Sequence, residues 1–280
     1  MRKFLLVFGV LFSFFAAPLS AFAQENKRTS PDALEFALNN SIYVLYHEIA
    51  HLLISKLEIP ILGREENAAD NFATLMLMRA DTEQTDNALI DSAMGWFLSS
   101  ESDNQEYYSD DDLYGEHNLD VQRAFQIVCL MVGGDAAVFS DIADEVGLDE
   151  ERQKDCEADY EQASDSWDIV LKPYINKNPQ ELEINIIYDR GYGLVSAGKL
   201  LQKNQFFENS VANILQKYTL PSLPNMRGKE CHEANAYYDN WTGEILFCYE
   251  LVDQFVSLFE ENEIKKEKQK EEKEDVKDKK

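Results

Sequence analysis

Basic residues are scarce in this chain: 26 lysines and arginines stand against 52 aspartates and glutamates, for a formal net charge of -26. Nucleic acid and anionic membrane surfaces repel such a chain, so neither is expected as a partner. After the first residues, the sequence also lacks any apolar run long enough to cross a bilayer. We therefore predict no membrane span in the mature chain.

The acidic residues lack the spacing of a common calcium site. They are concentrated at residues 99–112, but this segment has neither EF-hand spacing nor a glycine at the turn. We interpret it as a solvated acidic loop. Weak calcium binding stays open, and with it a rival reading of the chain as a calcium-dependent interaction protein.

Only four cysteines are present, and no CxxC spacing favours a cysteine-ligated metal. In an exported chain an even number of cysteines predicts disulfides. Proximity in the sequence favours pairing Cys129 with Cys156 and Cys231 with Cys248, although spacing alone leaves other pairings open.

Residues 1–23 are typical of a secretion signal. Arg2 and Lys3 precede an apolar run from Phe4, and small residues stand at Ala21 and Ala23, where signal peptidase reads the chain. We therefore predict export to the periplasm or the medium. The folded domain should cover residues 24–264, and residues 265–280 should form a mobile charged tail.

The most informative motif is HEIAH, which sets His47 and His51 four residues apart with Glu48 after the first histidine. On a helix the two imidazoles share one face and can bind one metal ion, while Glu48 can reach a water on that ion. The alternative is a solvated polar edge of an amphipathic helix. The apolar neighbours of the motif favour a buried helix.

A second helix follows the turn at Gly63 and carries Glu66 and Asp70 on one face. Two helices joined by a short turn are antiparallel neighbours, so Glu66 can supply a third ligand beside His47 and His51. Asp70 can accept the second ring N–H of a ligand histidine. The competing interpretation of both acids is a solvated helix face.

Other elements are predicted from apolar periodicity. We expect helices at residues 33–56, 64–80, 124–132, 138–167, 206–218 and 249–261, a strand at 182–188, and a hairpin formed by 235–239 and 244–248. The predicted fold class is therefore α+β, mainly helical, with a small antiparallel sheet near the C-terminus.

HEIAH followed by Glu66-Asn-Ala-Ala-Asp70 resembles the Glu-zincin metallopeptidases, the thermolysin and neprilysin type. The blocks PILGREENAADNFA and CHEANAYYDNWTGEILFCYEL also resemble an uncharacterised group of exported bacterial metallopeptidase-like proteins. This resemblance implies Glu66, rather than Glu65, as the third zinc ligand, with Asp70 behind a ligand histidine.

Resemblance to known zinc peptidases also implies roles for two further pairs of residues. His117 and Arg123 are spaced as in membrane-type zinc peptidases related to the CAAX proteases, which implies that His117 holds the oxyanion and Arg123 supports the site. Asn235 and Ala236 resemble the neprilysin edge strand that binds substrate backbone. The alternatives are a surface pair near a helix cap and an ordinary hairpin.

One feature departs from the Glu-zincin pattern. In those enzymes the substrate-binding hairpin usually precedes the HExxH helix, whereas here it comes last, so the order of elements looks permuted. If so, the C-terminal part must fold back onto the zinc helices to complete the cleft.

The sequence therefore predicts an exported Zn²⁺-dependent peptidase acting on a peptide or protein substrate. His47, His51 and Glu66 would hold the metal, and Glu48 would be the general base. The alternative is a zinc-binding or interaction protein of the same compartment that has lost catalysis.

Overall fold

The computed structural model describes residues 29–102, 114–177, 183–191 and 196–278. The predicted secretion signal and most of the acidic segment at 99–112 lie outside these ranges. Within them the chain is α+β and mainly helical, as the sequence predicts. Its elements are α1 (Pro31–Lys56), α2 (Glu65–Ala80), α3 (Glu83–Ser102), α5 (Asp120–Gly134), α6 (Ala136–Glu145), α7 (Glu150–Leu171), β1 (Asn185–Tyr188), α8 (Ala197–Lys203), α9 (Phe206–Asn213), β2 (Asn225–Lys229), β3 (Ala236–Asp239), β4 (Glu244–Cys248) and α10 (Tyr249–Asp278), with 3₁₀ turns at Lys172–Tyr174 and Leu215–Lys217.

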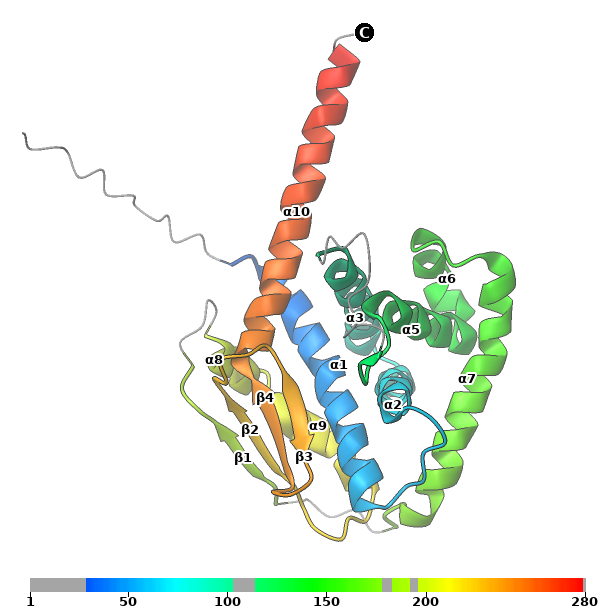
Figure 1. Ribbon diagram of the computed structural model, residues 1–280, viewed down its shortest axis with the longest axis vertical. Helices are drawn as coiled ribbons and strands as arrows, with labels where there is room; N and C mark the ends of the chain where they lie inside the picture. Colours follow the sequence, from blue (N-terminus) through cyan, green and yellow to red (C-terminus); the bar gives the residue numbers. More distant parts are fainter. Residues whose placement is uncertain (1–28, 103–113, 178–182, 192–195, 279–280) are drawn as a thin grey trace, which may run out of the picture.

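Helix α1 lies in the middle of the molecule. Helices α2 and α3 pack on one side of it, with α5 and α7 beyond them, and α10, β3 and α9 pack on the other (Figure 1). Because both sides are covered, the residues around the HEIAH motif, such as Leu45, Ile49 and Leu53, are completely buried. The motif therefore lies in the core of the fold rather than on a solvated helix edge.

The sheet has the strand order β1-β2-β4-β3 and is mixed, so the prediction of an antiparallel sheet is wrong. The predicted hairpin of β3 and β4 is antiparallel, but β1 and β4 both run parallel to β2. Strand β2 lacks apolar alternation, and its Gly228 instead lets the ring of Tyr249 approach closely. Strand β3 is the edge strand next to α1.

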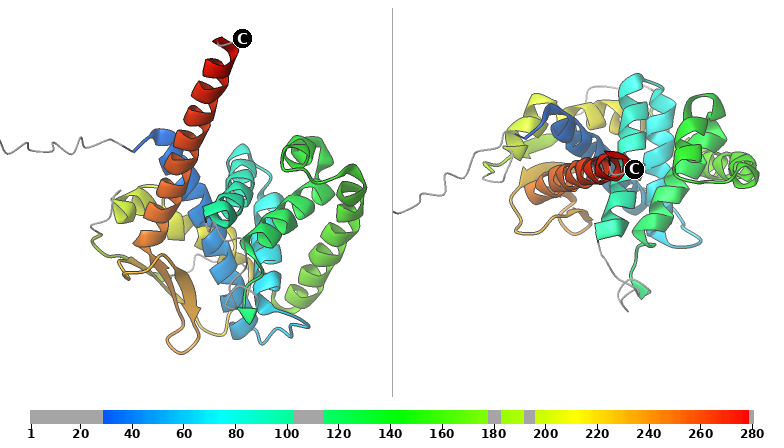
Figure 2. Two further views of the ribbon diagram at one scale, coloured as in Figure 1. Left: turned by 45° about the horizontal axis from the view of Figure 1, so that its top comes forward. Right: turned by 90° about the horizontal axis from the view of Figure 1, so that it is seen from above.

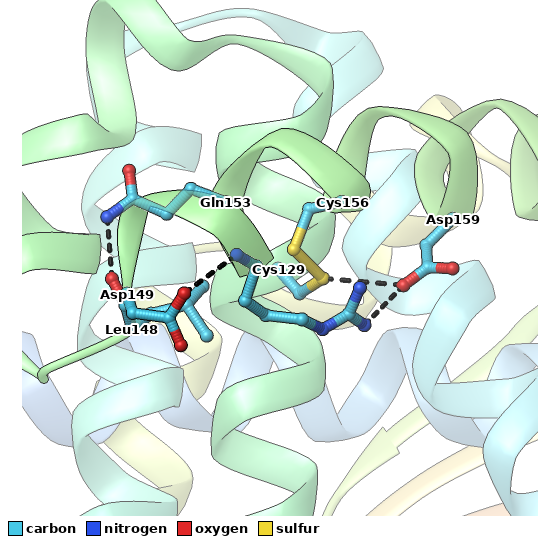
Figure 3. Close-up of a disulfide and its surroundings, with 7 residues drawn as sticks. Cys129, Leu148, Asp149, Gln153, Cys156 and Asp159 are labelled. Atoms are coloured by element: carbon cyan, nitrogen blue, oxygen red, sulfur yellow. Dashed lines mark hydrogen bonds and ion pairs between the residues drawn. A yellow bond between two sulfur atoms is a disulfide. The ribbon is translucent and has the colours of Figure 1, made fainter.

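Both predicted disulfides are present. Cys129 of α5 pairs with Cys156 of α7, and Cys231 pairs with Cys248 at the end of β4. Figure 3 shows the first bridge, where Asp159 lies 3.6 Å from the Cys129 sulfur. This bridge joins α5 to α7. The second bridge ties the segment before β3 to the end of β4, just before α10 begins.

The expected helix at residues 138–167 is two helices, α6 and α7. Gly147 between them has a φ of 78°, a left-handed conformation that favours glycine and ends a helix. The Asp149 side chain then accepts hydrogen bonds from the amides of Glu151 and Arg152 and caps α7. Similarly, the expected helix at 206–218 ends earlier, at Asn213.

Two other helices differ in extent from the sequence prediction. Helix α3 includes residues 99–102, which were expected in the acidic loop. Helix α10 continues to Asp278, through the expected charged tail, and extends beyond the body of the protein (Figure 2). No glycine or proline follows Tyr249, and glutamate and lysine are good helix formers, so nothing in the sequence ends α10 at residue 264. None of the described helices is long and apolar enough to cross a membrane.

We expect the Gly133→Ala substitution to destabilise the fold, because a Cβ at Gly133 would lie 2.1 Å from the Cys156 carbonyl oxygen of α7. Overpacking of this kind costs about 1–3 kcal/mol of unfolding free energy. The control is Gly63→Ala, where a Cβ meets no atom within 4 Å. Urea unfolding should separate the two variants, and equal stabilities would contradict the close α5–α7 packing.

Candidate metal centre

The first element of the site is the C-terminal half of α1. The helix begins at a Ser30 cap, whose hydroxyl accepts a hydrogen bond from the Ala33 amide, and Pro31 occupies its first turn. His47 and Glu48 are buried, with exposed fractions of 4% and 6%, while His51 is half-buried at the edge of a cleft. The HEIAH motif is thus held on a rigid, well-packed helix.

Helix α2 brings Glu66 against both histidines. Glu66 Oε2 lies 3.1 Å from His47 Nε2 and 3.3 Å from His51 Nε2, and the two Nε2 atoms are 3.0 Å apart. A tetrahedral ion bound at about 2.0–2.1 Å keeps its ligand atoms roughly 3.4 Å apart. The three predicted donors are therefore spaced close to what a single divalent ion requires.

The electrostatics of these donors also suit a cation. Burial lowers the pKa of His47, but hydrogen bonds to Asp70 and Glu66 outweigh it and raise this pKa to about 9. Burial raises the pKa of Glu66, but hydrogen bonds from His117, His47 and His51 hold it well below the usual range. The same acidic surroundings that favour a proton on this buried imidazole also attract a cation, which displaces the proton when it binds.

Asp70 connects the site to α5. Its Oδ1 lies 2.8 Å from His47 Nδ1, which directs the other ring nitrogen toward Glu66. Arg123 donates from Nε to Oδ2 and from an Nη to Oδ1, each at 2.8 Å, and its guanidinium lies 3.7 Å from the centroid of the Trp96 ring. Burial raises the pKa of Asp70, but Arg123 and His47 lower it well below the usual range. The carboxylate thus stays charged and orients His47.

Glu65 has a role that the sequence did not indicate. Its Oε1 lies 2.8 Å from His51 Nδ1, so it orients His51 as Asp70 orients His47. The resemblance compared Glu65 only with Glu66 as a metal ligand. The sequence does contain a signal for this role, namely two adjacent acids at the start of α2. Neighbouring side chains on a helix point in different directions, so Glu65 and Glu66 can reach different ring nitrogens.

Glu48 lines the same cleft and is held by β3. Its Oε2 accepts a hydrogen bond of 2.8 Å from the Tyr238 amide of β3. Burial raises the pKa of Glu48, although the charges of His47 and His51 lower it. One carboxylate oxygen is therefore fixed by β3, and a base of raised pKa lies beside the donors, which suits proton transfer.

His117 contacts Glu66 directly and therefore lies next to the three donors. Its Nε2 is 2.8 Å from Glu66 Oε2, and half of its side chain is exposed. Arg64 donates to the carbonyl oxygens of His117, at 3.0 Å, and of Gly115, at 3.3 Å, which holds this segment against the start of α2. The structure thus places His117 on Glu66, a contact that its predicted oxyanion role does not require.

Strand β3 forms the wall of the cleft opposite α2. Asn235, Ala236 and Tyr238 line it, as expected if the C-terminal part folds back onto the HEIAH helix. The Asn235 carbonyl accepts from the Cys248 amide of β4, while the Tyr238 amide points to α1. Because backbone direction alternates along a strand, Ala236 and Tyr238 direct their backbone groups toward the cleft. Ala236 is thus better oriented to contact an extended chain than Asn235, whose side chain accepts from the Ala236 amide.

These elements enclose a cleft of about 630 Å³ with the predicted donors, Glu48, His117 and Arg123 at its lining. A buried HExxH helix, a carboxylate as the third donor and an adjacent base form the arrangement found in metal-dependent hydrolases. Residues 11–171 and 194–279 match the model of a family described as "Putative metallopeptidase", so the chain belongs to that family. Searches of curated proteins and of solved structures gave no match.

We predict that Glu65→Ala weakens binding of a divalent metal by about 10- to 100-fold, because His51 loses the acceptor that orients it. Glu116→Ala is the control, since it removes an equal charge from an exposed position of the same cleft. Its effect should stay within about threefold because solvent and salt screen an exposed charge. Titration with Zn²⁺ against a chelating dye measures the affinity of both variants. Equal losses of affinity would mean that Glu65 acts only through its charge and does not orient His51.

Proposed function

We propose that the chain is an exported zinc metallopeptidase of the Glu-zincin type, which hydrolyses peptide bonds in a peptide or protein substrate. The observation that carries this proposal is the convergence of His47 Nε2, His51 Nε2 and Glu66 Oε2 within 4.8 Å of one another, next to Glu48. Zinc suits two imidazoles and one carboxylate in a site that leaves a fourth position for water. When bound there, the metal lowers the pKa of that water and polarises the scissile carbonyl.

Glu48 is the general base of this mechanism. It takes the proton of the attacking water and delivers it to the leaving amine. The Tyr238 amide engages Oε2, so the other carboxylate oxygen is the one that faces the water. The raised pKa of Glu48 suits this role, because it makes the carboxylate a stronger base toward the water proton.

We assign substrate binding to β3 and His117. The edge strand offers the cleft-facing carbonyl oxygens of Ala236 and Tyr238 to an extended substrate, in the manner of strand addition, because the amides of both residues are already bonded to Asn235 and Glu48. Asn235 supports this strand through its bond to the Ala236 amide. His117, half exposed beside Glu66, is the residue we assign to the developing oxyanion, for which its ring must turn from Glu66 toward the substrate.

Export is supported by the secretion-type sequence at residues 1–23 and by both disulfides, which form in oxidising compartments. We assign residues 24–264 to the peptidase domain and the rest of α10 to a charged extension. The family match, which spans most of this region, supports a single domain.

We predict that Glu48→Gln keeps the metal but lowers kcat/KM by about 10²- to 10⁴-fold, because glutamine preserves the shape and cannot take a proton. Glu116→Gln removes a charge from the same cleft and should retain most activity. Cleavage of a labelled peptide mixture by zinc-loaded protein measures the effect. A zinc-loaded parent that cleaves nothing would favour the alternative, a zinc-binding protein that has lost catalysis.

A further inference from the structure

A second groove lies on another face of α2, away from the predicted metal donors. It has a volume of about 680 Å³ and shares no lining residue with the cleft that holds those donors. Its walls are α2, α7 and the connection between α1 and α2 (Figure 1). Glu66 and Asp70 of α2 contact His47, whereas Asn67 and Asn71, each one residue further along, line this groove. We call it the amide groove.

The length of the amide groove follows from α7. The residues of α7 that line it, from Asp159 to Val170, are spaced three and four apart and so form one face of the helix. This face is roughly 16 Å long, which about five residues of an extended chain also span. At the mouth of the groove Leu62 and Ile169 are 103% and 70% exposed. An occupant can therefore remove apolar surface from water.

The amide groove is almost free of charge, although 28% of the residues in the chain are charged. Arg64 and Asp159 are the charged residues of its lining, and both are engaged. Arg64 donates to the carbonyl oxygens of Gly115 and His117, and Asp159 accepts from Arg152. The groove thus offers no free counter-charge to a phosphate or to a charged side chain.

The aromatic residue of the groove is also engaged. Trp167 is 4% exposed, and its ring packs edge-on against Phe72, with the ring centroids 4.8 Å apart. Recognition of a nucleobase usually requires an open aromatic face on which the base can stack. Neither the charge nor the aromatic surface of the groove therefore suits a nucleotide.

Carboxamides are the polar groups that face the groove. Asn67 and Asn71 come from α2, Gln126 from α5 and Gln162 from α7, and within the described ranges none of these side-chain amides bonds to another residue. Asn71 Oδ1 is buried and has no hydrogen-bond partner there. A carboxamide offers an acceptor and N–H donors, the same groups that a peptide backbone offers. A buried acceptor without a donor destabilises a fold, so its presence points to a donor from outside.

We propose that the amide groove binds an extended, uncharged segment of about five residues from a polypeptide partner. The four carboxamides bond to the backbone of this segment, and its apolar side chains cover Leu62 and Ile169. The site is separate from the proposed catalytic centre, and binding there requires neither zinc nor Glu48.

The test measures binding of the fluorescein-labelled pentapeptide SLSLS to full-length protein by fluorescence anisotropy. The protein carries Glu48→Gln, so that cleavage at the proposed catalytic centre cannot consume the probe. Two matched peptides have glutamate in place of leucine, or N-methyl groups on the backbone nitrogens of the leucines. Each should bind about tenfold more weakly or worse, because the first brings charge to a neutral groove and the second removes backbone donors. The zinc chelator 1,10-phenanthroline should leave binding of SLSLS unchanged.

Asn71→Leu separates a binding role from a structural one. Leucine has a similar size but no polar atom, so the variant should bind SLSLS about tenfold more weakly. It should also unfold at the same or a higher temperature, because the free protein loses a buried acceptor that has no partner. Asn87→Leu is the control, since it makes the same change on α3 outside the lining of the groove.

Ala163→Trp fills the groove and should abolish binding of SLSLS. Its control is Ala158→Trp, at an exposed position of α7 that does not line the groove. Circular dichroism confirms that each variant is folded, and size-exclusion chromatography with light scattering measures its oligomeric state.

Several results would overturn this assignment. They are no binding of SLSLS up to about 1 mM, equal affinity for the N-methylated peptide, unchanged binding in the folded Asn71→Leu and Ala163→Trp variants, or displacement by the chelator. A parent dimer that Ala163→Trp dissociates would also overturn it, because the occupant would then be a second copy of this chain. None of these measurements depends on cleavage, so the peptidase function stands or falls separately.

Discussion

The geometry of the predicted metal centre depends on one buried ion pair, Asp70 with Arg123. Through Asp70 the pair orients His47 on α1, through Arg123 it reaches α5, and the guanidinium stacks on Trp96 of α3. Burying two charges costs several kcal/mol per ion, and an apolar replacement of similar volume is often as stable. A buried pair that links four helices at the predicted metal donors is therefore better explained by the geometry it imposes on His47 than by its contribution to stability.

The cleft is assembled from parts that are far apart in the sequence. Helices α1 and α2 carry the predicted metal donors, while β3, almost 200 residues later, supplies the amide that holds Glu48. The disulfide between Cys231 and Cys248 fixes the segment that leads into this hairpin and into α10. The C-terminal third thus contributes to the cleft twice: its edge strand forms one wall beside Glu48, and its last helix adds Leu251, Gln254, Phe255 and Leu258 to the lining.

Local rules predicted the parts of the site that lie within single helices. The spacing of His47 and His51, and of Glu66 and Asp70, places each pair on one helix face whatever the rest of the fold does. The short turn at Gly63 then made α1 and α2 neighbours. Sequence proximity also favoured the two disulfides that the structure contains, because each bridge closes a short segment of chain.

Tertiary context decided what the sequence did not reveal. Strand β2 pairs in parallel with β1 and β4, and no local pattern specifies a pairing between distant segments. The contact of Glu65 with His51, and that of Glu48 with Tyr238, depend on how a helix start and a distant strand meet α1. Composition alone underestimates the extent of α10, because a charged run without core residues is typical of a disordered tail, whereas its lysines and glutamates are also good helix formers.

The central claim is that His47, His51 and Glu66 form one metal site, and metal content tests it most directly. Elemental mass spectrometry of purified mature protein should find about one zinc per chain after reconstitution with Zn²⁺, and the Glu66→Ala variant should lose it. A parent without zinc, or a folded Glu66→Ala variant that retains full stoichiometry and affinity, would contradict the account.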